Sequence, residues 1–179
     1  EKGYSRINIL QSNNKNSYIY FRIPSWDKNM KIIINRKKIN YEIFNGYAKI
    51  KYLWKKGDKI ELFFNFEPRL VRTNPNVRYN IRKACLFRGP ILYCLEEKDN
   101  GRNLNKFILD SSNNITEKNM KINSQKVISL LTKAYLYKDT KKLYLNDKPK
   151  YSKKNIKFIP YYKWSNRGEN EMLVWVNEN

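Results

Sequence analysis

YIYFRIP, residues 18–24, alternates apolar side chains with polar or tyrosine side chains, which indicates a β-strand with two unlike faces. Ile19, Phe21 and Ile23 share one of these faces. The stretch KIELFFNF, residues 59–66, repeats the pattern. A period of two suits a sheet that has one face on a core and the other toward water.

The same patterning recurs along the chain and predicts mostly strands. Turns are indicated at NGY (45–47) and KGD (56–58), where glycine permits a positive φ. Many short strands without a convincing helix indicate an all-β fold built from one or two antiparallel β-sandwiches. Residues 98–125 are polar and predict long loops around one short strand. The further predicted strands are 5–10, 31–35, 47–52, 83–87, 91–96, 106–109, 127–137, 142–145, 156–160 and 171–176.

The chain is strongly basic, with 37 Lys and Arg residues against 16 Asp and Glu residues and a net charge of +21. Such a charge raises the question of a polyanionic partner, because basic surfaces release counterions from phosphate. However, the excess is mostly lysine, whereas arginine makes the bidentate contacts to phosphate and guanine. The lysines are also scattered over every segment. Both features disfavour nucleic-acid binding and favour a solvated surface.

The sequence offers little for catalysis or metal binding. It has no histidine, so the commonest general base and metal ligand is absent. Cys85 and Cys94 lie in apolar strand-like runs and are expected to be buried free thiols. Glu96 and Glu97 are adjacent and would point to opposite faces of a strand, so they cannot act as a glycosidase pair. We therefore predict no catalytic residue and no metal ligand in this chain.

The aromatic cluster in IPYYKWSNRG, residues 159–168, leaves three alternatives open. Tyr161, Tyr162 and Trp164 could pack in a core, form an inter-domain contact or present a platform for a glycan. Composition and strand pattern do not decide among the three.

Five motifs, taken together and in this order, resemble the C-terminal part of glycoside hydrolase family 127, the group that contains β-L-arabinofuranosidases. Each motif alone is weak, but together they cover the chain nearly from end to end. The motifs are FRIPSW (21–26), GYAKIKYLWKKGDKIEL (46–62), RLVRTNPNVR (69–78), ACLFRGPILYCLE (84–96) and IPYYKWSNRGENEMLVW (159–175).

The resemblance implies two antiparallel, jelly-roll-like β-sandwich domains that follow a catalytic helical barrel. The family's cysteine nucleophile, zinc ligands and acid/base glutamate lie in that barrel, and no position of this chain matches them. The chain is therefore expected to be a non-catalytic accessory region without a cofactor, with zinc only in the catalytic domain. Its expected partners are that barrel, a second copy in a homodimer, or an arabinose-containing glycan.

The family architecture also suggests the path of the chain. The first sandwich would span residues 1–84 and be completed by a returning strand at 171–176, and the second would span 85–170. In that architecture IPYYKWSNRG would end the second sandwich with its aromatic rings packed, Arg167 would anchor the crossing between the domains, and Gly168 would supply the reversal into the last strand. Core packing is therefore the provisional expectation, and Trp164→Ala would then cost roughly 3 kcal/mol of stability. No apolar run approaches the roughly 20 residues of a membrane helix and no signal peptide is evident, so we expect no membrane partner and favour the cytoplasm. The residues expected at an inter-domain or glycan contact are Trp26, Arg88, Tyr161, Tyr162, Trp164, Asn166 and Arg167.

Overall fold

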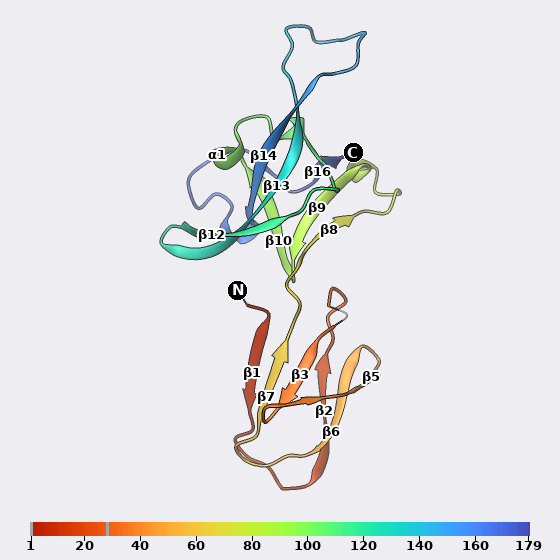
Figure 1. The fold of residues 1–179 in the computed structure, drawn as a ribbon, viewed down its shortest axis with the longest axis vertical. Coiled ribbons are helices and arrows are strands. Elements are labelled where there is room, and N and C mark those ends of the chain that lie inside the picture. Colours follow the sequence, from red (N-terminus) through yellow and green to blue (C-terminus); the bar gives the residue numbers. More distant parts are fainter. Residues whose placement is uncertain (1, 28) are drawn as a thin grey trace. The chain divides into compact units, whose positions relative to one another are not determined.

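The computed structural model describes residues 2–27 and 29–179, and the chain divides into two compact units (Figure 1). The first unit ends at Glu67 and the second extends from Pro68 to Asn179. Strands dominate both units, and the antiparallel, nearly all-β fold class predicted from the alternating pattern is confirmed.

The first unit is a sandwich of two antiparallel sheets. One is four-stranded, in the order β1 (Tyr4–Asn8), β7 (Lys59–Phe63), β3 (Lys31–Ile34) and β4 (Lys37–Ile39). The other is three-stranded, in the order β2 (Asn16–Arg22), β6 (Tyr47–Leu53) and β5 (Glu42–Phe44). The buried core joins Ile32 of β3 and Ile60 of β7 to Ile50 of β6, so the two sheets pack face to face.

Turn residues connect these strands as their sequence predicts. Asn45 and Gly46, with φ values of 47° and 79°, form the reversal between β5 and β6. Asn35 and Arg36, with φ values of 48° and 68°, reverse the chain between β3 and β4. Two consecutive left-handed residues match the right-handed twist of the paired strands.

The second unit contains a nine-stranded sheet that closes on itself. Its order is β15 (Met172–Leu173), β10 (Ile91–Glu96), β14 (Tyr151–Pro160), β13 (Gln125–Tyr137), β11 (Phe107–Leu109), β16 (Val176–Glu178), β9 (Lys83–Arg88) and β8 (Pro68–Arg72), with β12 (Thr116–Ile122) beside β13. An additional β9–β10 pairing completes the circuit. The β11–β16 pairing is parallel, whereas the other pairings within this sheet are antiparallel.

The curled sheet encloses the larger core of the molecule. Leu86 of β9, Tyr93 of β10, Leu130 of β13 and Phe158 of β14 are all fully buried in it. Short helical turns connect the strands at η1 (Arg78–Asn80), α1 (Glu97–Asn100), η2 (Leu104–Lys106) and η3 (Tyr161–Lys163).

The structure places the boundary between the units elsewhere than the sequence suggested. The expected boundary at residue 84 lies inside β9, and the turn-rich segment 73–80 connects β8 to β9 within the second unit. The predicted return of 171–176 to the first unit is also wrong, because β15 pairs with β10 and β16 pairs with β9. These backbone hydrogen bonds assign the segment to the second unit.

The segment 142–145, predicted as a strand, lies in the loop that connects β13 to β14. Leu143 and Tyr144 are 94% and 91% exposed there. The β13–β14 hairpin extends beyond the rest of its unit (Figure 1), and no neighbouring strand is paired with this loop among the described residues. An apolar triplet without a pairing partner does not form a strand.

Candidate functional site

Residues 161–168, here called the aromatic loop, present their rings to solvent. Tyr161, Tyr162 and Trp164 are 40%, 52% and 40% exposed. The provisional expectation that these rings pack in a core is therefore wrong. The loop follows β14, and its first residues form η3.

A buried ion-pair network fixes the aromatic loop to the sheet. The carboxylate of Glu96, at the end of β10, is fully buried and accepts two hydrogen bonds from the Arg167 guanidinium, the one from Nε at 3.1 Å. Its other oxygen accepts the backbone N–H of Ser165 at 2.9 Å. Charge-assisted bonds of this kind restrict the geometry of the groups that they join.

Asp99 of α1 extends the network. Its side chain accepts hydrogen bonds from Arg167 at 2.5 Å and from Lys157 of β14 at 2.9 Å. Burial alone would raise the pKa of Asp99, but the hydrogen bonds from Arg167 and Lys157 outweigh it and lower the pKa. The two carboxylates of Glu96 and Asp99 are thus balanced by two cations.

Asn100 holds α1 in place beneath this network. Its amide donates to the carbonyl oxygens of Glu96 and Lys157, each at 2.9 Å, and its side-chain oxygen accepts the Lys157 N–H at 2.9 Å. Asn100 is 3% exposed, so all of these bonds are shielded from water. The support of the aromatic loop is therefore part of the folded core of the second unit.

The backbone of the aromatic loop turns back on itself. Ser165 and Gly168 have φ values of 63° and 96°, and Gly168 supplies the reversal that the sequence indicated. The Asn166 amide donates to the Trp164 carbonyl at 3.2 Å. The rings of Tyr161 and Trp164 stack with centroids 6.1 Å apart and an interplanar angle of 24°. The result is an exposed aromatic surface on a firmly held backbone.

The other two predicted contact residues lie away from this network. Trp26 belongs to the first unit, where it is half-buried against the rings of Phe64 and Phe66, with centroids 6.1 and 5.6 Å away. Arg88 is 7% exposed and pairs with Glu117 of β12 at 2.7 Å. Arg167 was expected to anchor a crossing between domains, but both of its carboxylate partners belong to its own unit.

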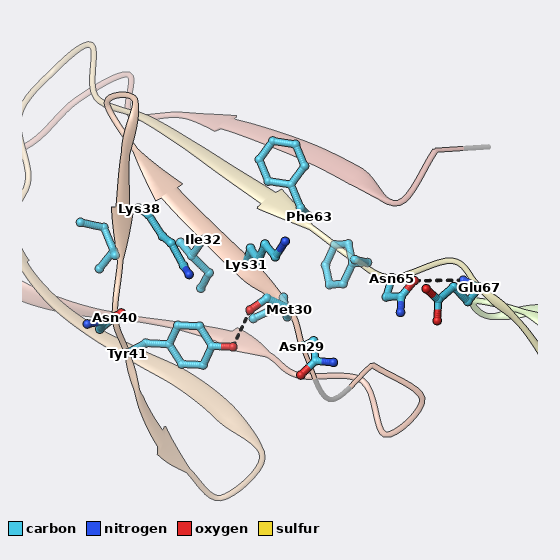
Figure 2. Close-up of a pocket in the computed structure, with 12 residues that line it drawn as sticks. Asn29, Met30, Lys31, Ile32, Lys38, Asn40, Tyr41, Phe63, Asn65 and Glu67 are labelled. Atoms are coloured by element: carbon cyan, nitrogen blue, oxygen red, sulfur yellow. Dashed lines mark hydrogen bonds between the residues drawn. The ribbon is translucent and has the colours of Figure 1, made fainter.

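The first unit also contains a pocket that the sequence analysis did not predict, and Figure 2 shows the residues that line it. Its volume is about 670 Å³, and two of its lining residues, Asn29 and Asn65, donate their backbone N–H groups to the buried Asp27 carboxylate at 2.9 Å each. Tyr41 points its hydroxyl at the Met30 carbonyl, to which it donates at 2.6 Å (Figure 2). Amide, aromatic, aliphatic and charged side chains line this pocket, among them Asn40, Ile32 and Lys38.

The two cysteines are buried and free, as predicted. Burial raises the pKa of the Cys94 thiol to about 12 and also raises that of Cys85. Both therefore stay protonated at neutral pH, and a protonated thiol is a poor nucleophile. Among the residues that the structure describes, no group of three or more His, Cys, Asp or Glu side chains could hold a metal ion.

Two further carboxylates near the aromatic loop accept hydrogen bonds from backbone N–H groups. Glu171 accepts the N–H groups of Asn103 and Leu104 at 2.7 and 2.9 Å, and Glu97 accepts the N–H of Glu171 at 3.1 Å. Glu97 also pairs with Arg102 at 2.9 Å.

Among the residues that the structure describes, no helix has the length and the apolar character needed to span a membrane.

Comparison with known families gives two matches that follow the two units. A family model described as the GH127 middle domain of β-L-arabinofuranosidase matches residues 1–66. A second, described as the C-terminal domain of glycoside hydrolase family 127, matches residues 68–177. The boundary between the two matches agrees with the structural division at Glu67.

Individual relatives agree with these matches. A non-reducing end β-L-arabinofuranosidase from Bifidobacterium longum is 25% identical over 167 residues, which cover 86% of this chain and 25% of that protein. The crystal structure of a GH127 β-L-arabinofuranosidase from Geobacillus stearothermophilus T6 is 34% identical, with a TM-score of 0.92, over 99% of this chain and 29% of that one. A structure described as a glycoside hydrolase is 26% identical, with a TM-score of 0.89, over 99% of this chain and 30% of that one.

The chain thus spans between a quarter and a third of the length of the relatives that it matches. The resemblance to glycoside hydrolase family 127 that the five sequence motifs indicated is confirmed for both units of the chain. The chain belongs to glycoside hydrolase family 127, of which it carries the middle and C-terminal domains.

Proposed function

We propose that this chain is a non-catalytic accessory region of a β-L-arabinofuranosidase, which supports a catalytic domain supplied by other residues. The observation that carries the proposal is that two family models described as middle and C-terminal domains account for nearly all of the chain. The chain covers only 29% of the Geobacillus stearothermophilus enzyme, which leaves the larger part of such an enzyme for the chemistry.

The side chains of the second unit support this proposal. Glu96 and Asp99 neutralise Arg167 and Lys157, and Glu171 binds backbone N–H groups. A carboxylate that is fully engaged in this way is not available to protonate a glycosidic oxygen or to attack a sugar. The protonated, buried thiols of Cys85 and Cys94 are equally unsuited to nucleophilic attack.

The aromatic loop is the proposed contact with the catalytic domain. Exposed tyrosine and tryptophan rings are typical anchors of protein interfaces, because they bury a large area with few rotatable bonds. The Arg167 network holds the loop in one conformation, which reduces the entropy that a partner would have to overcome on binding. A homodimer contact through the same loop would use the same chemistry.

The chain alone should not hydrolyse an aryl β-L-arabinofuranoside, because the groups that act on the sugar are assigned to the catalytic domain. The measurement is release of the aryl group by the purified chain, compared with its Cys85→Ser and Cys94→Ser variants. Hydrolysis that is abolished by Cys85→Ser but retained by Cys94→Ser would contradict the non-catalytic role.

Removing the Trp164 ring should leave the chain stable. Because the side chain is 40% exposed, we expect Trp164→Ala to change the free energy of unfolding by less than about 1 kcal/mol. The matched control is Trp54→Ala, whose ring is 3% exposed and should cost about 3–5 kcal/mol. Denaturant unfolding measures both, and equal losses would show that the Trp164 ring is a core residue.

A glycan platform is the second candidate for the same loop, favoured by the stacked rings of Tyr161 and Trp164. It predicts that the chain binds arabinose-containing glycans and that Trp164→Ala abolishes this binding without altering stability. A contact with the catalytic domain predicts no glycan binding at this loop. Affinity electrophoresis in arabinan distinguishes the two.

A further inference from the structure

The outer surface of the three-stranded sheet in the first unit carries a second set of aromatic rings. Tyr18 and Tyr20 of β2 and Phe44 of β5 are 48%, 46% and 47% exposed. Strand alternation directs them away from the core, which takes Ile19 and Phe21 instead. We call this surface the β2–β6 face; it consists of Tyr18, Tyr20, Arg22, Phe44, Lys49 and Lys51.

Strand register interleaves these rings with cations. Lys51 and Lys49 of β6 lie opposite Tyr18 and Tyr20, and Arg22 lies opposite Tyr47. The Lys49 ammonium group is 5.0 Å from the centre of the Tyr18 ring and 5.3 Å from that of Phe44. The Lys51 ammonium group is 5.8 Å from the Tyr18 ring. Such contacts attract the ammonium groups to the ring faces.

The charge of the β2–β6 face is unbalanced. The neighbouring Glu42 of β5 pairs with Lys49 at 3.3 Å. Lys51 and Arg22 are exposed cations of the same face, and no ion pair of either is found among the described residues. A surface that combines exposed rings with excess positive charge is complementary to a polyanion that also has apolar ring faces.

The geometry of the rings discriminates between two such polymers. Single-stranded nucleic acids need ring faces on which successive bases stack. Here the rings of Tyr18 and Tyr20 are tilted by 36° and those of Tyr20 and Phe44 by 57°, and lysine ammonium groups occupy positions over Tyr18 and Phe44. Sugar rings make C–H contacts with single aromatic side chains and need no continuous stack.

We propose that the β2–β6 face binds a carboxylated polysaccharide, with a sugar ring against Tyr20 and sugar carboxylates paired with Lys51 and Arg22. The chain's family cleaves glycosidic bonds, so a glycan is a polymer that it encounters. Such binding would hold the protein on an acidic glycan independently of the aromatic loop. The proposed glycan binding does not depend on whether the chain is catalytic.

The test is affinity electrophoresis and calorimetry of the purified 179-residue chain with polygalacturonate, neutral arabinan and poly(dT) as probes. We expect binding to polygalacturonate that weakens as salt is added, with weaker binding to arabinan and poly(dT). Tyr20→Ala and Lys51→Gln should each reduce the affinity for polygalacturonate by about threefold to tenfold.

Matched controls separate this face from the general positive charge of the chain. Tyr144→Ala and Lys141→Gln remove the same groups from the exposed β13–β14 loop, and they should leave the affinity unchanged. Thermal melting checks that each variant is folded. If Tyr20→Ala does not fold, Lys51→Gln alone tests whether the β2–β6 face binds polygalacturonate. Equal losses in the face and loop variants, failure to bind polygalacturonate, or equally tight binding of poly(dT) would each overturn the proposal.

Discussion

Replacing Arg167 by methionine should lower the free energy of unfolding by about 3–5 kcal/mol, because it leaves buried negative charge without its main partner. Glu96 is fully buried, and the Asp99 side chain is 8% exposed. After the substitution Glu96 would retain the Ser165 N–H, and Asp99 would retain Lys157. Methionine keeps much of the arginine's apolar stem, so most of the loss is electrostatic. Denaturant unfolding monitored by circular dichroism measures it.

Two further variants isolate the buried charge. Arg102→Met removes an arginine that also pairs with a carboxylate, Glu97, but whose side chain is 86% exposed. This control should change stability by less than about 1 kcal/mol. The double variant Glu96→Gln/Arg167→Met should be more stable than Arg167→Met alone, because the buried charge is removed together with its partner. A loss in Arg167→Met no larger than that in Arg102→Met would show that the network contributes nothing.

The stability that Arg167→Met removes should depend on pH, because Arg167 contributes to the lowered pKa of Asp99. The pKa of Asp99 is lowered in the folded chain, so its contribution to stability is complete above the ordinary aspartate range and is lost as the pH falls through the folded pKa. Removing Arg167 takes away one cause of that lowering. The stability difference between the natural chain and Arg167→Met should therefore be largest at neutral pH and narrow below about pH 4.

The faces of the strands could be predicted from the sequence because they follow from local alternation. In β2 and β7 the apolar positions Ile19, Ile60 and Leu62 line the core as the pattern requires. Strand β12 was missed because its apolar residues, Met120 and Ile122, lie only at its end and most of the strand is exposed. Pairing with β13 along its whole length forms that strand, and an exposed strand leaves no period-two signal in the sequence.

The conformation of the aromatic loop could not be predicted for a different reason. Its position depends on an ion pair between Glu96 and Arg167, which are separated by 71 positions in the sequence. Nothing local to Tyr161 or Trp164 distinguishes a ring that packs inward from one held outward by such a contact. The polar residues of the loop, among them Ser165 and Asn166, do not by themselves show which way its rings face.

Phe158→Ala should lower the free energy of unfolding by about 3–5 kcal/mol, because it opens a cavity at the centre of the curled sheet. Phe158 lies on β14, is fully buried, and is opposite Leu95 of β10 and Leu130 of β13 in the strand register. Strands on both sides hydrogen-bond to β14, so the backbone cannot easily collapse into the space.

Two further variants show whether the loss of stability in Phe158→Ala comes from the cavity. One changes Phe158 to a different residue, and the other removes an exposed phenylalanine. Phe158→Leu leaves a smaller space and should cost clearly less than Phe158→Ala. Phe44→Ala removes the same atoms from a ring that is 47% exposed, and it should cost less than about 1 kcal/mol. Denaturant midpoints with unchanged slopes would show that the variants differ in stability and not in the extent of folding. If Phe158→Ala were no more damaging than Phe44→Ala, the curled sheet could not be packed around this ring.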